Sequence, residues 1–267
     1  MNLDLQAYLA RVGYRGPVAA TRAALVELHR AHAATIPFEN LDIQMGRPIR
    51  IDLASVQAKL VAQRRGGYCF EQNTLFRAAL EAFGFEPLRR EARVRFGAPV
   101  LLPRTHGVHT LLCEGREWLV DVGFGGEGIL EPIPMDGEEV EQFGLRYRVA
   151  EEGPRRVLQR LRPEGWFDLY AIEPEPVEAI DWEMGNHFTS TFPESRFVLT
   201  LTAQRPTPEA RHSLRGATYT CLREGVETAR ELRTHGELMA LLRGTFGLDL
   251  PEEVRFRALD LPREAEP

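Results

Sequence analysis

Hydrophobic residues recur at every third or fourth position through the first third of the chain, which is the spacing of α-helices that bury one face. Glycine and proline interrupt this pattern at Gly13, Pro17 and Pro37, so it divides into short segments. The expected helices cover residues 3–12, a segment that begins after a capping Thr21, residues 55–63 and residues 70–83. We therefore predict a helical N-terminal region in which the last helix is buried among the others.

From about residue 87 the pattern changes to alternation, which is typical of strands with one buried face. Residues 105–113 and 117–124 flank Glu114-Gly115, so we expect a hairpin with a two-residue turn. Further strands are expected at 91–96, 145–149, 157–161, 166–170, 197–202 and 217–223, an irregular segment at 181–192 and a closing helix at 231–246. Helices followed by antiparallel strands and a last helix predict an α+β fold, not alternating βα units.

The composition is that of a globular protein, with 43% hydrophobic and 27% charged residues in a chain of 267. The net charge is −6 and the basic residues are scattered, which argues against nucleic-acid binding. No apolar run approaches the length of a membrane span, and the N-terminal residues lack the pattern of a secretory signal. We therefore expect a cytoplasmic protein that binds neither nucleic acid nor membranes.

Three cysteines, Cys69, Cys113 and Cys221, lie far apart and form neither a CxxC motif nor the Cys/His spacing of a zinc site. His29 and His32 are three positions apart and could ligate a metal, but no further ligand is nearby in the sequence. We expect these histidines to be structural or solvated, and we predict no metal site. Sparse cysteines favour a reducing compartment and thiol chemistry over disulfides.

Cys69 follows a Gly-Gly pair and stands at the start of a predicted helix. The unpaired N–H groups and the helix dipole at that end favour a thiolate over a thiol, and Arg64 and Arg65 just upstream could add to the effect. A lone cysteine is more often a small buried hydrophobe. Upstream, Glu39 lies among bulky apolar residues, where pairing with an arginine such as Arg64 is one explanation and a surface charge is the other.

A cysteine nucleophile needs a base and a group that orients the base. Asp121 lies in an apolar strand, where a carboxylate is costly to bury unless it is paired, and His106 and His109 lie on the opposite strand. With a two-residue turn Asp121 faces Val108, so His106 shares its face one diagonal step away and His109 points to the other face. A three-residue loop would instead place His109 opposite Asp121. We favour His106 and predict a site of Cys69, His106 and Asp121 for acyl transfer through a thioester.

Residues 123–128 match the pattern G-x-G-x-x-G of dinucleotide-binding folds and follow a predicted strand. The next residues include Pro132 and Pro134 and cannot open a helix, so no helix dipole would hold a pyrophosphate. We therefore reject a nucleotide-binding fold. The glycines, which have no side chains, would instead leave room beside the cysteine for an acyl donor, or they form an ordinary glycine-rich loop.

Several of these segments together resemble the motifs of the arylamine N-acetyltransferases. They are residues 64–73 (RRGGYCFEQN), 36–41 (IPFENL), 103–106 (PRTH), 121–126 (DVGFGG), 186–191 (NHFTST) and 193–195 (PES). One departure is that family members generally carry a bulky or basic residue and an aliphatic run after the catalytic histidine, whereas Gly107, Val108 and His109 follow His106. Shifting the pattern onto His109 requires a three-residue deletion, so the resemblance also keeps His106.

The resemblance implies three parts around a cysteine-protease-like core. These are a helical bundle over residues 1–86 that carries Cys69, an antiparallel β-barrel-like domain over 87–185 that carries His106 and Asp121, and a C-terminal α/β lid over 186–267. It also implies acetyl-CoA as donor and a ping-pong route in which Cys69 passes the acetyl group to an arylamine, arylhydrazine or arylhydroxylamine.

For the binding sites, the resemblance suggests that the loop at Gly125 and Gly126 and the run at Thr189, Ser190 and Thr191 border the CoA cleft. Thr189–Thr191 could equally be an ordinary polar turn.

Four aromatic residues are candidates for the acceptor pocket, although most aromatic residues are simply core. They are Phe38, Tyr68, Phe124 and Phe192. Two alternatives remain open from the residues alone. One is a cysteine hydrolase or transglutaminase-like enzyme that uses the same three residues, and the other is a binding module without catalysis.

Overall fold

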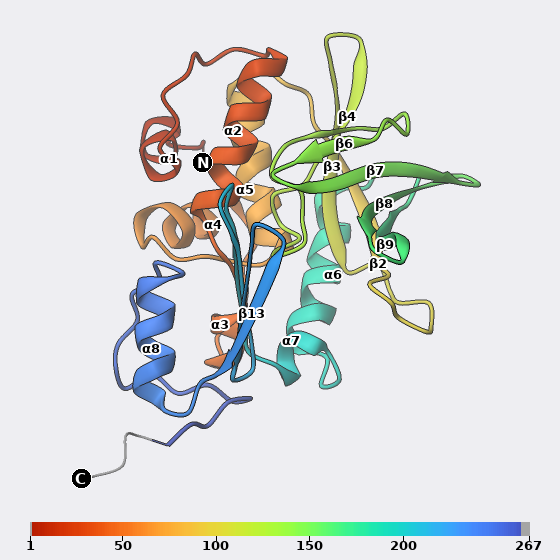
Figure 1. Ribbon diagram of the computed structural model, residues 1–267. Coiled ribbons are helices and arrows are strands. Elements are labelled where there is room, and N and C mark those ends of the chain that lie inside the picture. Colours follow the sequence, from red (N-terminus) through yellow and green to blue (C-terminus); the bar gives the residue numbers. More distant parts are fainter. Residues whose placement is uncertain (1, 263–267) are drawn as a thin grey trace.

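Helices dominate the N-terminal part of the computed structural model, which describes residues 2–262 (Figure 1). The helices are α1 (Leu5–Val12), α2 (Arg22–Thr35), α3 (Leu41–Gln44), α4 (Leu53–Gln57), the π-helical η1 (Ala58–Ala62) and α5 (Cys69–Ala82). Short polar side chains begin three of them: Asp4, Thr21 and Asp52 each accept a hydrogen bond from a backbone N–H of the first turn. The four predicted helices are confirmed.

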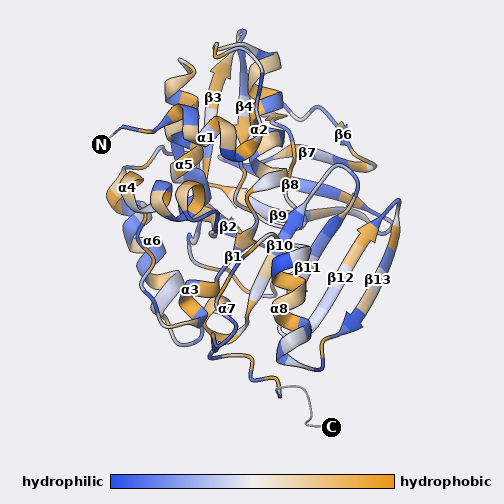
Figure 2. Cartoon of the chain, turned by 90° about the vertical axis from the view of Figure 1, so that its left-hand side faces the viewer, coloured by the Kyte–Doolittle hydropathy of each residue, from blue (hydrophilic) through white to orange (hydrophobic). Residues whose placement is uncertain are grey.

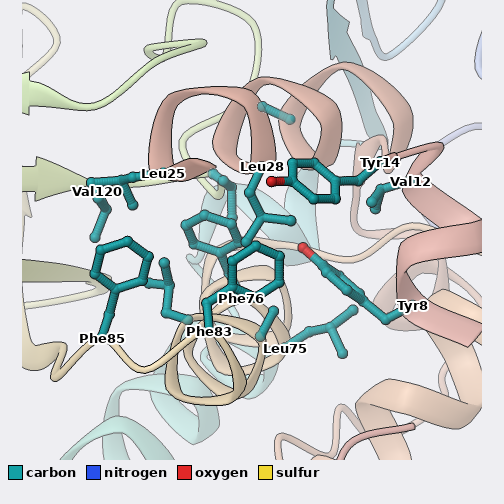
Figure 3. Packing of buried hydrophobic residues seen from close by; sticks show 14 of the residues in the cluster. Tyr8, Val12, Tyr14, Leu25, Leu28, Leu75, Phe76, Phe83, Phe85 and Val120 are labelled. Carbon is teal, nitrogen blue, oxygen red and sulfur yellow. The ribbon is translucent and has the colours of Figure 1, made fainter. Parts of the chain in front are cut away.

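One hydrophobic core joins this helical part to the first sheet (Figure 3). Aromatic and aliphatic side chains of α1, α2 and α5 meet there, and the sheet adds residues from the predicted hairpin. The core includes Tyr8, Leu25, Leu28, Leu75, Phe76, Phe83 and Val120. Because α5 packs between α1, α2 and the hairpin, its N-terminal residue Cys69 is held in a fixed position relative to the strands.

An antiparallel sheet of eight strands forms the middle of the molecule, in the order β5-β4-β3-β2-β9-β8-β7-β6. The strands are β2 (Leu88–Val94), β3 (His106–Cys113), β4 (Arg116–Val120), β5 (Ile133–Pro134), β6 (Val140–Gln142), β7 (Leu145–Glu152), β8 (Arg155–Arg162) and β9 (Gly165–Ile172). Strand β5 at one end of the sheet lies close to β7 near the other, so the sheet is a nearly closed barrel. Its interior is filled by buried side chains such as Tyr147, Leu158 and Leu169.

The hairpin between β3 and β4 has the predicted two-residue turn. Cys113 pairs with Arg116 and His109 with Val120. Glu114 and Gly115 both have positive φ, +51° and +77°, as a type I′ turn requires. This register confirms that His106 and His109 project to opposite faces of the sheet.

The C-terminal part combines helices with a second antiparallel sheet. Its elements are α6 (Ala179–Thr191), α7 (Arg196–Leu199), β10 (Thr202–Pro206), β11 (Arg211–Arg215), β12 (Thr218–Arg223), β13 (Val226–Glu231) and α8 (His235–Gly244). Strand β1 (Phe38–Glu39), from the N-terminal part, adds to this sheet in the order β1-β10-β11-β12-β13. Helix α8 packs on the face of the sheet through Leu238 and Leu242 (Figure 2).

Three local predictions in this part are wrong. Residues 181–192, expected to be irregular, lie in helix α6, whose buried face mixes Trp182 with Gly185 and Asn186 and so lacks an apolar period. Residues 197–202, expected to be a strand, are mostly the short helix α7, which begins where the Ser195 side chain accepts the Phe197 N–H. The closing helix starts at His235, because β13 occupies 226–231.

The predicted fold class is confirmed: a helical N-terminal part, a barrel-like antiparallel sheet and a C-terminal α/β part. The three-domain division stays a prediction, and β1 makes one sheet draw on both ends of the chain. No helix within residues 2–262 combines the length and the apolar character needed to cross a membrane.

Candidate active site

Cys69 is the first residue of α5 and is buried, with 3% of its surface exposed. The preceding glycines let the chain run directly against strand β1. Gly67 exchanges backbone hydrogen bonds with Pro37 and Glu39, and a Cβ on Gly66 would approach the Pro37 carbonyl oxygen to 2.2 Å. Any side chain at Gly66 would force these two segments apart, so the Gly-Gly pair fixes where the cysteine helix begins.

A buried network of charges surrounds the beginning of α5. Lys59 contacts both Asp42 and Glu71 at 2.7 Å, and Arg65 contacts Glu39 at 2.7 Å and Asp42 at 3.4 Å. Glu71 also accepts the backbone N–H at the helix start. Removing one charge would leave another buried and unpaired, so the network holds α5 against the segments before it.

Glu39 pairs with an arginine, as one of the two explanations proposed, but the partner is Arg65 and not the suggested Arg64. Arg64 instead adopts a positive φ of +54°. Two alternatives for Glu39 were a pair or a surface charge, and its carboxylate is fully buried and paired. Arg65 is occupied by carboxylates, so it is not a free positive charge beside Cys69.

His106 and Asp121 form the hydrogen bond that the hairpin register predicts, with 2.8 Å between Nε2 and Oδ2. The Asp121 carboxylate accepts three further hydrogen bonds, from the Tyr170 hydroxyl, the Asn73 amide and the Gly123 backbone N–H. Four donors aim at one carboxylate that is 1% exposed. Its charge is therefore stabilised and its position fixed.

Cys69 and the His106 ring line the same cavity, and Cys69 lies near enough to the imidazole to help raise its pKa. Since Nε2 of His106 donates to Asp121, Nδ1 is the ring nitrogen left for the cysteine. The sulfur also lies 3.7 Å from the Thr105 carbonyl oxygen. The structure thus brings together the three residues of the predicted site: Cys69 and His106 line one cavity, and Asp121 is bonded to His106.

The electrostatics of the pair favour an imidazolium and a carboxylate. Burial alone would lower the pKa of His106, but the charge and hydrogen bond of Asp121, followed by contact with Cys69, raise that pKa to about 10. Burial would raise the pKa of Asp121, but His106, Asn73 and Gly123 lower it to about 2. Between these values His106 is charged and Asp121 is ionised.

His109 occupies a different environment on the other face of β3. Its Nε2 donates to the Asn73 carbonyl oxygen at 2.9 Å, and its ring lies 5.0 Å from the Trp182 ring. Burial lowers the pKa of His109 to about 3, so it is neutral at ordinary pH. His109 therefore supports the backbone of α5 and does not reach Asp121.

Comparison with known proteins identifies the family of this chain. A family model described as N-acetyltransferase matches residues 21–255. The arylamine N-acetyltransferase of Mycolicibacterium smegmatis is 36% identical over 257 residues, and the match covers 94% of each chain. The chain belongs to the arylamine N-acetyltransferase family. It is accordingly an acyltransferase.

Solved structures of arylamine N-acetyltransferases share its fold. The enzyme of Nocardia farcinica is 41% identical with a TM-score of 0.87, over 93% of this chain and 90% of that one. The enzyme of Mycobacterium marinum, solved in complex with CoA, is 33% identical with a TM-score of 0.88, over 92% and 93% of the two chains.

In this arylamine N-acetyltransferase a cavity of about 860 Å³ opens onto Cys69 and His106. It lies between the barrel-like sheet, the end of α6 and the sheet β10–β13. Five residues expected to bind substrate line it: Phe38, Phe124, Gly126, Thr189 and Phe192. The volume falls within the range of about 300–1,000 Å³ typical of small-molecule sites.

The other three expected substrate-binding residues lie outside the lining of this cavity. Tyr68 is fully buried and its hydroxyl donates to Asn186. Gly125 presses against Gln204, whose Oε1 would lie 2.0 Å from a Cβ at this position. Ser190 donates to the Asn186 carbonyl oxygen within α6. Thr189–Thr191 is the end of a helix, not a polar turn.

The glycine-rich segment 123–128 is a loop and no helix follows it, as expected. Two side chains of the C-terminal sheet hold it: Gln204 accepts the Gly126 N–H, and Arg211 donates to the carbonyl oxygens of Gly126 and Gly128. The C-terminal part thereby fixes one wall of the enzyme's cavity.

Three residues that position Asp121 were absent from the predicted site. Asn73 follows Cys69 by one helical turn, which was a usable signal. Tyr170 lies on β9, far away in the sequence, and gives no local signal. His29 accepts the Asp121 backbone N–H at 3.1 Å and donates to the Leu130 carbonyl oxygen. His29 and His32 are thus structural, as expected, and residues 2–262 contain no cluster of ligands suited to a metal.

Proposed function

We propose that this enzyme transfers acetyl groups from acetyl-CoA to arylamines, arylhydrazines or arylhydroxylamines by a ping-pong mechanism through a thioester on Cys69. The observation that carries the proposal is the placing of Cys69 and His106 on one cavity, with His106 bonded to a buried, ionised Asp121. The relative from M. marinum was solved with CoA, which supports a CoA thioester as the donor.

In the first half-reaction the Cys69 thiolate attacks the carbonyl carbon of acetyl-CoA and a tetrahedral intermediate forms. Its collapse breaks the bond to the CoA sulfur, and the His106 imidazolium can give its proton to that sulfur as it leaves. The products are free CoA and acetyl-Cys69, with His106 now neutral.

In the second half-reaction an amine attacks the thioester carbonyl. Neutral His106 takes the proton that the nitrogen loses, and the Cys69 thiolate leaves. This restores the thiolate–imidazolium pair. The same two groups therefore serve both half-reactions in opposite directions, which a ping-pong cycle requires.

Asp121 stays ionised throughout and acts on His106, not on the substrate. Its hydrogen bond to Nε2 directs Nδ1 toward Cys69, and its charge stabilises the imidazolium that each half-reaction forms or consumes. Because Tyr170, Asn73 and Gly123 also bind the carboxylate, the carboxylate does not need to reorganise when His106 changes charge.

For the substrates, we assign Phe38, Phe124 and Phe192 to an aromatic acceptor and Gly126 and Thr189 to the CoA cleft. The Phe124 ring lies 5.3 Å from the His106 ring and nearly perpendicular to it, which supports a place beside the reacting carbonyl. Three cysteines without disulfides in this chain support a reducing, cytoplasmic location.

Acetylation without an acceptor tests the proposal. Protein incubated with acetyl-CoA alone should gain the mass of one acetyl group and release one equivalent of CoA, and Cys69→Ala should do neither. Adding aniline or phenylhydrazine should then remove the acetyl group as acetylated amine. Steady release of CoA and acetate with no acetylated amine would favour a hydrolase.

A further inference from the structure

Two arginines at the mouth of the cavity lack compensating charges. Arg196 begins α7 and Arg215 ends β11, and each residue is partly covered by the protein but keeps a solvent-exposed surface. Within residues 2–262 neither guanidinium has a carboxylate oxygen closer than 4.0 Å. Both arginines line the main cavity. A protein of net charge −6 thus keeps two uncompensated positive charges side by side at its substrate site.

The two arginines share a smaller hollow of about 230 Å³ that opens beside the main cavity. Thr200 and Thr202 add hydroxyl groups to its lining, and Phe96 and Leu102 add apolar surface. Neither Cys69 nor His106 reaches this hollow. A group bound in this hollow would therefore lie away from the reacting sulfur.

The other arginines of these two cavities have partners. Arg160 pairs with Glu127, Arg95 pairs with Glu152 and Asp168, and Arg211 donates to backbone carbonyl oxygens. Arg211 has no carboxylate of the described residues within 4.0 Å either, but it is 8% exposed and donates to two backbone carbonyl oxygens that it holds in place. Among the described lining residues, Arg196 and Arg215 are the arginines whose guanidinium groups make neither an ion pair nor a hydrogen bond to the protein, and this separates a recognition role from a structural one.

The two guanidinium groups also repel each other. Partial burial, and then the positive charge of Arg215, lower the pKa of Arg196. An anion between them would replace this repulsion with two attractions. Arginine forms paired N–H···O hydrogen bonds to phosphate and carboxylate, so the chemistry that fits is an oxyanion.

We propose that Arg196 and Arg215 form a subsite for a phosphate group of the donor CoA. This inference rests on the proposed function. CoA carries its phosphates far from its sulfur, as a recess away from Cys69 requires. An acidic substituent on a small arylamine fits less well, because the amine must reach Cys69 itself.

The experiment compares two donors that differ in phosphate. The rate constant for acetylation of Cys69 is measured in single turnovers with acetyl-CoA and with S-acetylpantetheine, which has no phosphate. Arg196→Gln and Arg215→Gln should each lower the rate constant for acetyl-CoA about tenfold, the effect of one charge-assisted hydrogen bond. The rate constant for S-acetylpantetheine should not change, and salt should weaken the preference for acetyl-CoA.

Arg223→Gln is the matched control, because it removes the same charge from the same sheet at a position outside the hollow. It should leave both rate constants unchanged. Equal losses with both donors in the Arg196 and Arg215 variants would overturn the proposal. A loss seen only with 4-aminobenzoate as acceptor, and not with aniline, would also overturn it and assign the subsite to an acceptor carboxylate.

Failure of this inference is distinguishable from failure of the proposed function. If neither donor acetylates Cys69 in the unmodified enzyme, the proposed function is wrong. If both donors acetylate it and the variants do not discriminate between them, only the phosphate subsite is wrong.

Discussion

Each face of strand β3 carries one buried histidine, and the pKa values of these two histidines are shifted in opposite directions. His106 and His109 are three positions apart and both are buried. Facing Asp121 and Cys69, His106 has its pKa raised to about 10, whereas His109, facing Trp182 and a backbone carbonyl group, has its pKa lowered to about 3. Burial lowers the pKa of both histidines, so the neighbouring carboxylate decides which of them becomes an imidazolium.

The largest effect should come from removing that carboxylate charge. Asp121→Asn keeps the size of the side chain but leaves His106 without a counter-charge and without a fixed tautomer. We expect the rate of acetyl-enzyme formation to fall on the order of a thousandfold or more. Single-turnover release of CoA measures this.

Glu117→Gln is the control for this substitution, since Glu117 is an exposed carboxylate on the neighbouring strand β4. It should retain nearly full activity. If Asp121→Asn is folded and retains activity within a factor of a few, the charge of Asp121 is not what distinguishes the two faces.

The pH dependence of stability should separate the two histidines. For His106 the folded pKa of about 10 exceeds the ordinary 6.5, so its stabilising contribution is complete below pH 6.5 and is lost as pH rises toward 10. For His109 the folded pKa of about 3 is lower, so stability is lost as pH falls from 6.5 toward 3.

Urea unfolding over a pH series measures both contributions. His106→Gln should flatten the alkaline loss of stability and His109→Gln the acidic loss, each by roughly 5 kcal/mol at the extreme. His29 and His32 also have lowered pKa values, so part of the acidic loss should survive in His109→Gln. If His106→Gln instead reduced the acidic loss of stability and His109→Gln the alkaline loss, the electrostatic roles given to the two histidines would be wrong.

A smaller effect is expected from removing one of the hydrogen bonds that hold the Asp121 carboxylate. Tyr170→Phe removes one of the four hydrogen bonds to the carboxylate and leaves the ring in place. We expect acetylation to become about tenfold slower. A hydrogen bond to a charged group contributes about 1.5–3 kcal/mol, and only part of this energy should affect the activation free energy of acetylation. Tyr14→Phe, which removes a hydroxyl bonded to the Pro17 carbonyl oxygen, is the control.

The sequence predicts those parts of the molecule that depend on local pattern. The helix that begins at Cys69 follows from apolar spacing, and the pairing of His106 with Asp121 follows from a two-residue turn and strand alternation. Both inferences hold because the residues involved are close in the chain or joined by one hairpin.

The parts that were missed depend on contacts between distant segments. Helix α6 buries Trp182 with Asn186 against other elements, so its own residues show no clear period. Tyr170 bonds to Asp121 from strand β9, which is far from Asp121 in the sequence. The suggested partner of Glu39 was Arg64, but the partner is the next residue, Arg65. Only the packed fold selects between two neighbouring arginines.

The most direct test of the account is to replace each of the two histidines and measure acetylation of Cys69. We expect His106→Gln to abolish acetyl-enzyme formation from acetyl-CoA and to slow alkylation of Cys69 near neutral pH, whereas His109→Gln should retain both rates within a few-fold. If His109→Gln abolishes acetylation in a folded protein and His106→Gln does not, the assignment of the base to His106 is wrong.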